Sequence, residues 1–249
     1  MGGANLSMEQ EGLLLLQDKK AIITGGTRGI GFSVAEVFLK NGASVALFGS
    51  RQETVDKALA QLKAENPAWE VIGMAPDLTD YAALDAAFSE VENRFGRIDI
   101  LVNNAGISAR EPLYEYTPEA FQRIMDLNVT AVFNGCRAAA IRMKAQGGGS
   151  IINTSSMVSL YGQPSGVGYP TSKFAVNGMT RSLARELGRD NIRVNAVAPG
   201  VTRTDMVANL PEEIVRRVCA PIPLGRMAEP EEVANVFLFL ASDTYLYYI

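Results

Sequence analysis

Short apolar runs alternate along this chain with longer amphipathic stretches, and this alternation restricts the possible folds more than any other feature. Each run is rich in aliphatic residues and lies close to Gly, Pro, Asn or Asp, which is typical of strands buried on both faces. The runs are AIIT (21–24), SVALF (44–48), EVIGMA (70–75), IDILVNN (98–104), SIINTSS (150–156) and IRVNAVA (192–198). Helical patterns lie between them at 31–42, 54–66, 81–96, 118–146 and 171–188.

Strand–helix alternation of this kind predicts right-handed βαβ units. We therefore expect an α/β fold with a single doubly wound parallel sheet, Rossmann-like, and helices on both faces. No Pro/Gly/Ser stretch is long enough to separate two domains, so we expect an N-terminal extension at 1–18 and one domain at 19–249. The alternation fails after Pro199, which predicts a functional loop insertion at about 201–228 with a short helix inside it.

Composition excludes several kinds of partner and chemistry. The chain has 23 Lys and Arg against 27 Asp and Glu, a net charge of −4 without like-charge blocks, so we expect no nucleic acid partner. Cys136 and Cys219 lack metal-ligand spacing, and there is no histidine, which argues against a metal site and a Ser-His-Asp hydrolase. No stretch predicts a signal peptide or a membrane span. We expect no membrane partner and a reducing, cytoplasmic location.

A glycine-rich turn, TGGTRGIG at 24–31, joins the first predicted strand to the first predicted helix. Glycines there let backbone N–H groups at a helix N-terminus approach a pyrophosphate that side chains would exclude. The spacing is Gly-x₃-Gly-x-Gly rather than G-x-G-x-x-G, and a glycine cluster alone can be merely structural. Its place between strand and helix favours a dinucleotide site that includes Gly25, Thr27, Arg28, Gly29, Ile30 and Gly31.

The residues after the second strand predict which dinucleotide binds. An NAD site usually has an acid there for the ribose 2′-OH, whereas a 2′-phosphate requires cations. Ser50 and Arg51 occupy these positions, and Arg28 can approach the same phosphate from the glycine turn. Two guanidiniums and a hydroxyl suit a dianionic phosphate. We expect NADP(H), with NAD(H) as the alternative if both arginines are only solvated surface charges.

Five motifs stand in order along the predicted domain: TGGTRGIG, NNAG at 103–106, Ser156, Tyr169-x-x-x-Lys173 and APG at 198–200. Together they resemble the short-chain dehydrogenase/reductase family, over nearly the whole chain from about Lys19 onward. The resemblance makes 19–249 a dinucleotide-binding catalytic domain. INTSSMVSLYGQPSGVGYPTSK and EPEEVANVFLFLASD are most similar to bacterial bile-acid hydroxysteroid dehydrogenases, and next to 3-oxoacyl-carrier-protein reductases.

The resemblance implies roles for individual residues. Ser156 would hydrogen-bond the substrate oxygen, and Asn128 would hold a water that links Lys173 to solvent. The alternatives are an Asn128 that only bonds helix backbone and an Asp77 that only caps a helix. Further cofactor contacts are implied for Asp77 and Leu78 at the adenine, Asn103 and Ala105 under the adenosine ribose, Thr202 and Thr204 at the nicotinamide carboxamide, and Tyr169 and Lys173 beside the nicotinamide.

Tyr169 and Lys173 are four residues apart, so on a helix they share one face with Cβ atoms about 5–6 Å apart. Pro170 fits the first turn of that helix. The lysine ammonium and an oxidised nicotinamide are expected to lower the pKa of Tyr169 from about 10 toward the working pH. Tyr169 would then exchange a proton with a carbonyl or alcohol oxygen. The alternative is a buried Tyr–Lys pair without chemistry.

The sequence therefore predicts an NADP(H)-dependent oxidoreductase that interconverts a secondary alcohol and a ketone, with a 3-hydroxy/3-oxo bile acid or steroid as substrate. Alternatives are a 3-oxoacyl-[acyl-carrier-protein] reductase and a non-catalytic dinucleotide-binding regulator. An apolar small-molecule substrate is suggested by residues that equally fit simple packing: Met157, Val158, Leu160, Tyr161, Val167, Met206, Val207, Leu210, Val218, Ile222, Leu224 and Met227.

The resemblance also implies a homotetramer or homodimer. Family members continue past ASD into a seventh strand, whereas this sequence ends at YLYYI (245–249). We therefore expect a sheet without the usual last strand.

Overall fold

The computed structural model describes residues 14–205 and 212–245, and within them six parallel strands form one sheet. The strand order is β3-β2-β1-β4-β5-β6, so the direction of winding reverses between β1 and β4. This order confirms the predicted doubly wound α/β fold. The strands are β1 Lys20–Thr24, β2 Ser44–Phe48, β3 Val71–Met74, β4 Ile100–Asn103, β5 Gly149–Thr154 and β6 Ile192–Val197.

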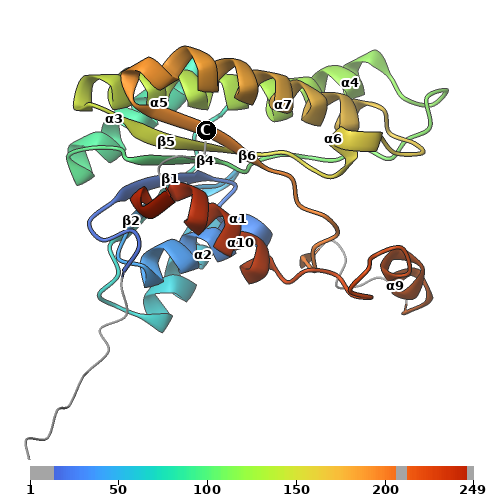
Figure 1. Ribbon diagram of the computed structural model, residues 1–249, viewed down its shortest axis with the longest axis horizontal. Helices are drawn as coiled ribbons and strands as arrows, with labels where there is room; N and C mark the ends of the chain where they lie inside the picture. The colour runs from blue at the N-terminus through green and yellow to red at the C-terminus, as the bar shows by residue number, and fades with distance from the viewer. Residues whose placement is uncertain (1–13, 206–211, 246–249) are drawn as a thin grey trace, which may run out of the picture.

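Helices cover both faces of the sheet (Figure 1). One layer holds α1 Gly29–Lys40, α2 Gln52–Glu65 and α10 Pro230–Ala241, and the other holds α3 Tyr81–Phe95, α5 Ala131–Gln146 and α7 Gly168–Leu187. Neighbouring strand residues belong to different cores, because successive side chains point to opposite faces. Ile23 packs in the core beneath α1, for example, and Ile22 in the core beneath α5.

Two of the predicted helical stretches need correction, and two further helices are present. The stretch 118–146 is not one helix: α4 Pro118–Met125 and α5 are joined by a π-helical turn at Asp126–Thr130. Helix α7 begins at Gly168, three residues before the predicted stretch, and its first turn contains Tyr169 and Pro170, as expected from their spacing before Lys173. Two helices were not predicted, namely α10 and the short α6 Val158–Tyr161.

The segment between β6 and α10 contains the predicted insertion and its short helix, α9 Glu212–Cys219. Thr202 forms a parallel bridge with Ala228, which closes the base of the segment. Helix α9 lies away from the body of the domain (Figure 1). Met206, Val207 and Leu210 lie outside the described residues, as do positions 1–13 of the predicted extension and most of YLYYI, the terminal segment after which family members continue into a seventh strand.

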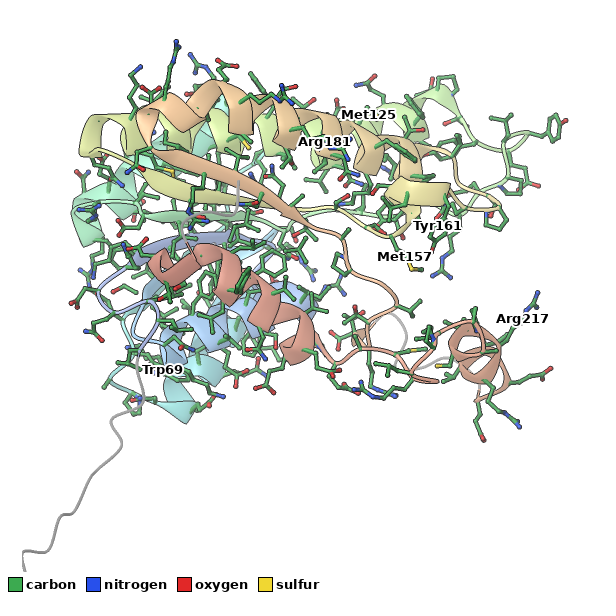
Figure 2. All side chains as sticks on the ribbon, viewed as in Figure 1. Trp69, Met125, Met157, Tyr161, Arg181 and Arg217 are labelled. Carbon is green, nitrogen blue, oxygen red and sulfur yellow. The ribbon has the colours of Figure 1, made fainter. Side chains whose placement is uncertain are left out.

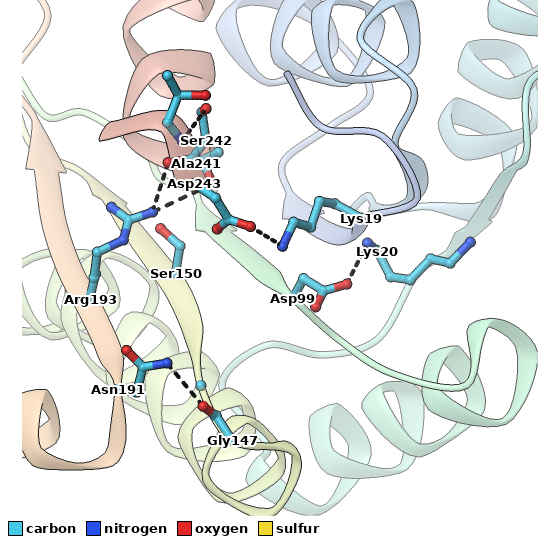
Figure 3. A network of polar contacts seen from close by, with 12 residues as sticks. Lys19, Lys20, Asp99, Gly147, Ser150, Asn191, Arg193, Ala241, Ser242 and Asp243 are labelled. Carbon is cyan, nitrogen blue, oxygen red and sulfur yellow. Dashed lines mark hydrogen bonds and ion pairs between the residues drawn. The ribbon is translucent and has the colours of Figure 1, made fainter. Parts of the chain in front are cut away.

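The amino-terminal ends of the strands are held together by polar contacts (Figure 3). These contacts join β1, β4 and β6 to the end of α10. They lie at the opposite ends of the strands from the predicted site. They comprise the Lys20 N–H with Asp99 (2.9 Å), the Lys19 ammonium with Asp243, and Arg193 Nη2 with the carbonyls of Ala241 (3.5 Å) and Ser242 (3.4 Å).

Two features are absent from the described part of the chain. No helix there is both long and apolar enough to cross a membrane. The same residues contain no group of three or more His, Cys, Asp or Glu side chains that could hold a metal ion.

Candidate active site

The carboxyl ends of β1 and β4 are tied together by side-chain bonds that shape one rim of the site. Thr24 lies beside Asn103 in the sheet. Its hydroxyl accepts the N–H groups of Asn104 (3.0 Å) and Ala105 (3.1 Å), and the Asn104 amide donates to the Gly25 carbonyl (3.2 Å). The glycine turn and the NNAG segment are therefore one structural unit, although they lie far apart in the sequence.

The glycine turn leaves no room for side chains at two of its positions. Gly25 has φ +65°, and a Cβ on it would lie 2.9 Å from the Ala105 Cα; a Cβ on Gly31 would lie 2.2 Å from the Gly25 carbonyl oxygen. Helix α1 begins at Gly29, and its N-cap residue Arg28 makes no side-chain cap bond. By contrast, Asp80 caps α3 through its carboxylate. The first N–H groups of α1 therefore lack a side-chain acceptor and suit a pyrophosphate.

Other predicted cofactor residues border this turn. A Cβ on Gly49 would lie 2.6 Å from the Thr27 methyl carbon, and one on Gly29 would lie 3.3 Å from the Thr204 methyl carbon. The end of β2 and the segment after β6 thus flank the glycine turn on two sides. Thr202, two residues before Thr204, is buried, and its hydroxyl donates to the Gly200 carbonyl (3.3 Å).

The three residues predicted to bind the 2′-phosphate lie at the surface beside the turn. Arg28, Ser50 and Arg51 are all exposed. The ion pairs found among the described residues include neither arginine. Both guanidiniums therefore lie in a position to meet an anion from solvent.

The adenosine side of the predicted site is less uniform. Asp77 is exposed, and Thr79 donates to it from both its N–H (2.9 Å) and its hydroxyl (2.6 Å), bonds that lower the pKa of the carboxyl. Asp77 therefore does not cap α3. Leu78 packs against the core under α5. The Asn103 side chain is directed into the core, where it donates to Asn153 (2.9 Å), so only its backbone can face a cofactor.

Tyr169 and Lys173 face each other on α7, as their spacing predicts. The Lys173 ammonium lies 5.7 Å from the centre of the Tyr169 ring and donates to the Thr154 carbonyl (2.7 Å) at the end of β5. Lys173 is only 4% exposed, and burial lowers its pKa to about 8. A lysine with this pKa can gain or lose a proton close to neutral pH.

The expected fall in the pKa of Tyr169 is wrong for the protein alone. Burial raises this pKa because the phenolate would lose its solvation, and a hydrogen bond with Ser156 offsets the rise only in part. The ammonium of Lys173 is committed to the Thr154 carbonyl instead. Tyr169 is therefore a protonated phenol at neutral pH, which suits a proton donor better than a base.

Ser155 and Ser156 point to opposite sides, as alternation along the strand predicts. Ser156 is buried; its hydroxyl lies 3.4 Å from the Val158 N–H and lowers the pKa of the nearby Tyr169 phenol. The Ser155 hydroxyl instead contacts Ser159 (3.1 Å). Of the two serines, Ser156 is thus the one placed beside the tyrosine.

Asn128 lies within the π-helical turn and is completely buried. Its side chain accepts the Ile107 N–H (2.9 Å) and donates to the Ile107 carbonyl (2.8 Å) and the Ser172 hydroxyl (3.0 Å). A Cβ on Gly106 would lie 3.1 Å from Asn128 Oδ1 and 3.7 Å from the Lys173 ammonium. Asn128 and Lys173 therefore both border Gly106. The π turn, which sequence patterns do not reveal, places the asparagine there.

Residues outside the predicted set complete the site. Ser172 donates to the Tyr169 carbonyl (2.7 Å) and so links Asn128 to the helix of the tyrosine. Thr154 contributes its backbone carbonyl to Lys173. The YPTSK sequence offered a signal for Ser172, because it precedes Lys173, but no sequence signal identifies a backbone acceptor.

The described residues of the predicted apolar lining differ widely in exposure. Val158 and Met227 are buried and serve packing. Leu160, Tyr161 and Leu224 are 69%, 70% and 79% exposed, which leaves their surfaces available for a ligand. Figure 2 shows Met157 and Tyr161 on the side of α6 that faces the segment carrying α9.

Comparisons with known proteins agree with this geometry. The sequence profile described as short chain dehydrogenase matches residues 19–214. The chain is 65% identical over 230 residues to a 3α-hydroxysteroid dehydrogenase of Mediterraneibacter gnavus, with 92% of each chain covered. It is 40% identical over 228 residues to a 3-oxoacyl-[acyl-carrier-protein] reductase of Thermotoga maritima, again covering 92% of each.

Two further relatives extend the comparison. A 3-alpha-(or 20-beta)-hydroxysteroid dehydrogenase of Mycobacterium tuberculosis is 41% identical over 225 residues, which cover 90% of this chain and 83% of that protein. The crystal structure of a Sinorhizobium meliloti protein, provisionally assigned as a short-chain alcohol dehydrogenase, superposes with a TM-score of 0.89 at 33% identity, covering 95% and 94% of the two chains. The chain therefore belongs to the short-chain dehydrogenase/reductase family of NAD(P)-dependent oxidoreductases.

Proposed function

We propose that this protein is an NADP(H)-dependent oxidoreductase that interconverts the 3-hydroxy and 3-oxo groups of bile acids or steroids. The observation that carries the proposal is the meeting of Ser156, Tyr169 and Lys173 at one edge of the sheet, in a chain 65% identical to a 3α-hydroxysteroid dehydrogenase. The corresponding identity to a 3-oxoacyl-[acyl-carrier-protein] reductase is 40%, which favours the steroid over the acyl thioester.

Ser156 and Tyr169 would act directly on the substrate oxygen. A bound nicotinamide dinucleotide supplies or accepts the hydride. During reduction Tyr169 donates its proton to the carbonyl oxygen, and the Ser156 hydroxyl stabilises the negative charge that develops there. Because burial raises the pKa of Tyr169, the phenol holds its proton at neutral pH, where reduction is favoured. Alcohol oxidation requires the phenolate and accelerates as pH rises.

Lys173 and Asn128 would return the proton to Tyr169. Lys173, with a pKa of about 8, exchanges protons easily near neutral pH. Asn128 bonds Ser172 and borders Gly106 together with Lys173, where the second lone pair of its Oδ1 can accept a hydrogen bond from a water on the route to solvent. These four side chains, Asn128, Ser156, Tyr169 and Lys173, are the proposed catalytic residues.

The dinucleotide would bind across the glycine turn. Its pyrophosphate meets the uncapped N-terminus of α1, and the ribose 2′-phosphate meets Arg28, Ser50 and Arg51. The backbone of Asn103 and Ala105, the exposed Asp77 and adjacent Leu78 would border the adenosine. Thr202 and Thr204, on the far side of the turn, would border the nicotinamide.

Two copies or more would associate in the active protein, as a homodimer or homotetramer. The support is an apolar outer surface on two neighbouring helices: Phe133 and Ile141 on α5 and Phe174 on α7 are each about half exposed, at 47%, 53% and 50%. Large apolar side chains gathered on one outer face often mark an interface between subunits.

A spectrophotometric screen tests the proposed activity. NADPH and NADH oxidation are followed with a 3-oxo bile acid, acetoacetyl thioester and a small ketone as acceptors. We expect the highest kcat/KM with NADPH and the 3-oxo bile acid. Preference for the thioester would make the protein an acyl reductase, comparable rates with NADH would overturn the assignment of the arginines, and absence of turnover with every acceptor would favour a regulator.

A further inference from the structure

Ser159, in the short helix α6, has a side chain that uses its whole hydrogen-bonding capacity. The residue is 2% exposed. Its hydroxyl accepts from the Asn177 amide (2.8 Å) and the Ser155 hydroxyl (3.1 Å) and donates to the Ser156 carbonyl (2.7 Å). A serine hydroxyl offers one donor and two acceptor positions, so all three are occupied. Such a saturated buried group fixes the relative positions of its partners.

These partners belong to three elements that together form the proposed active site. Ser155 follows β5, and its hydroxyl lies 3.5 Å from the Lys173 carbonyl. Asn177 lies on α7 one helical turn beyond Lys173. The Ser156 carbonyl receives both the N–H (3.0 Å) and the hydroxyl of Ser159. The cluster therefore contacts the backbone carbonyls of both Ser156 and Lys173.

The turn that Ser159 closes also sets the position of the Ser156 hydroxyl. That hydroxyl lies 3.4 Å from the Val158 N–H, within the same turn, and it lowers the pKa of the nearby Tyr169 phenol. We propose that Ser159 and Asn177 are positioning residues, which hold the Ser156 hydroxyl at the distance from Tyr169 that proton transfer requires. This inference rests on the proposed function for its kinetic test, but not for its spectroscopic one.

The kinetic test is Ser159→Ala, assayed with NADPH and the 3-oxo bile acid. The substitution leaves the Ser155 hydroxyl and the Asn177 amide without their partner, so the turn relaxes. We expect kcat to fall about tenfold or more, because displacement of a catalytic group by a fraction of an ångström is costly. The KM for NADPH should not change, since the cluster does not contact the glycine turn. Ser159→Thr keeps the hydroxyl and should restore most of the activity.

The spectroscopic test follows the ionisation of Tyr169 itself. Subtracting the ultraviolet pH titration of each protein's Tyr169→Phe version isolates this phenol from the other seven tyrosines. The titratable groups near it are Lys173, on its own helix, and Tyr116, whose hydroxyl borders Gly168 from the segment before α4. Neither is altered by Ser159→Ala. Because a weaker bond from Ser156 disfavours the phenolate, the ionisation should move upward by about half a pH unit.

Ser150→Ala is the matched control. Ser150 is also buried on β5 and donates to a backbone carbonyl, that of Leu240 (3.2 Å), but at the opposite end of the strand. Ser150→Ala should lower the melting temperature without changing kcat or the pH at which Tyr169 ionises. If Ser159→Ala behaves like Ser150→Ala in both respects, the cluster is only structural and the inference is wrong.

If Ser159→Ala does not fold, both measurements are repeated on Asn177→Ala, which removes one of the three hydrogen bonds of the Ser159 hydroxyl. A smaller change in the same direction supports the inference, and unchanged values contradict it. If the unmodified protein turns over no 3-oxo bile acid, the proposed substrate fails. The ionisation of Tyr169 still decides whether Ser159 and Asn177 position Ser156.

Discussion

Among single residues, Lys173 carries the largest electrostatic cost in the proposed site. Its pKa falls from 10.5 to about 8 through burial, which corresponds to about 3 kcal/mol of unfavourable charge burial. Below pH 8 the lysine is protonated in both folded and unfolded chains, so the cost is fully present. Between pH 8 and 10.5 the folded protein binds fewer protons than the unfolded chain, and stability therefore rises with pH.

Lys173→Met should accordingly stabilise the protein at pH 7 while abolishing its activity. Removal of the charge outweighs loss of the bond to the Thr154 carbonyl, and we expect a gain of about 2 kcal/mol in the free energy of unfolding. The gain should disappear by about pH 10. Urea denaturation at both pH values measures it, with Lys57→Met, on an exposed part of α2, as the control. A destabilised variant at pH 7 would contradict this account of the site.

For single residues, the sequence predicts which side chains meet but not which ionised form they favour. The four-residue spacing of Tyr169 and Lys173 was sufficient to predict that they meet. It could not predict the direction of the tyrosine pKa, because burial and the bond from Lys173 to Thr154 depend on how α7 packs against β5. Tertiary surroundings, rather than spacing, decide which ionised form is favoured.

At the scale of elements, the strands were predictable and several helices were not. Buried parallel strands give short aliphatic runs with clear boundaries, and all six were found. Helix α10 ends in the continuous apolar run VFLFLA, a pattern that does not distinguish a buried helix from a strand. The π turn around Asn128 depends on bonds to Ile107 and Ser172, which lie far away in the sequence.

The expected preference for NADPH over NADH can be tested at the end of β2, beside the glycine turn. Arg51→Ala removes one of two exposed guanidiniums predicted to meet the 2′-phosphate. We expect the KM for NADPH to rise about tenfold, the usual scale for one charge-assisted bond, while the KM for NADH stays unchanged. Steady-state kinetics with both cofactors measures the difference.

The control for nonspecific loss of positive charge is Arg181→Ala. Arg181 is an exposed arginine of α7, in the other helical layer from α1 and α2. The substitution should affect neither cofactor. Equal effects of Arg51→Ala on NADPH and NADH would show that Arg51 does not read the 2′-phosphate.

On the scale of the whole molecule, the two helical layers differ in their outer surfaces. The layer of α5 and α7 exposes the aromatic rings of Phe133 and Phe174 and the side chain of Ile141. We expect a homodimer or homotetramer in light scattering, and dissociation to smaller species in Phe174→Glu. Val236→Glu, a half-exposed site on α10 in the other layer, should leave the assembly intact. A monomeric unmodified protein would contradict the expected association.

The most direct test of the proposed function compares the unmodified protein with Tyr169→Phe in NADPH-dependent reduction of a 3-oxo bile acid. The phenol is the proposed proton donor, so its removal should lower kcat about a thousandfold, within the usual range for a general acid. NADPH binding, followed by nicotinamide fluorescence, should change little, because the substitution removes only the hydroxyl and leaves the glycine turn intact. A Tyr169→Phe protein that retains kcat within a few-fold of the unmodified protein would contradict the proposed role of Tyr169.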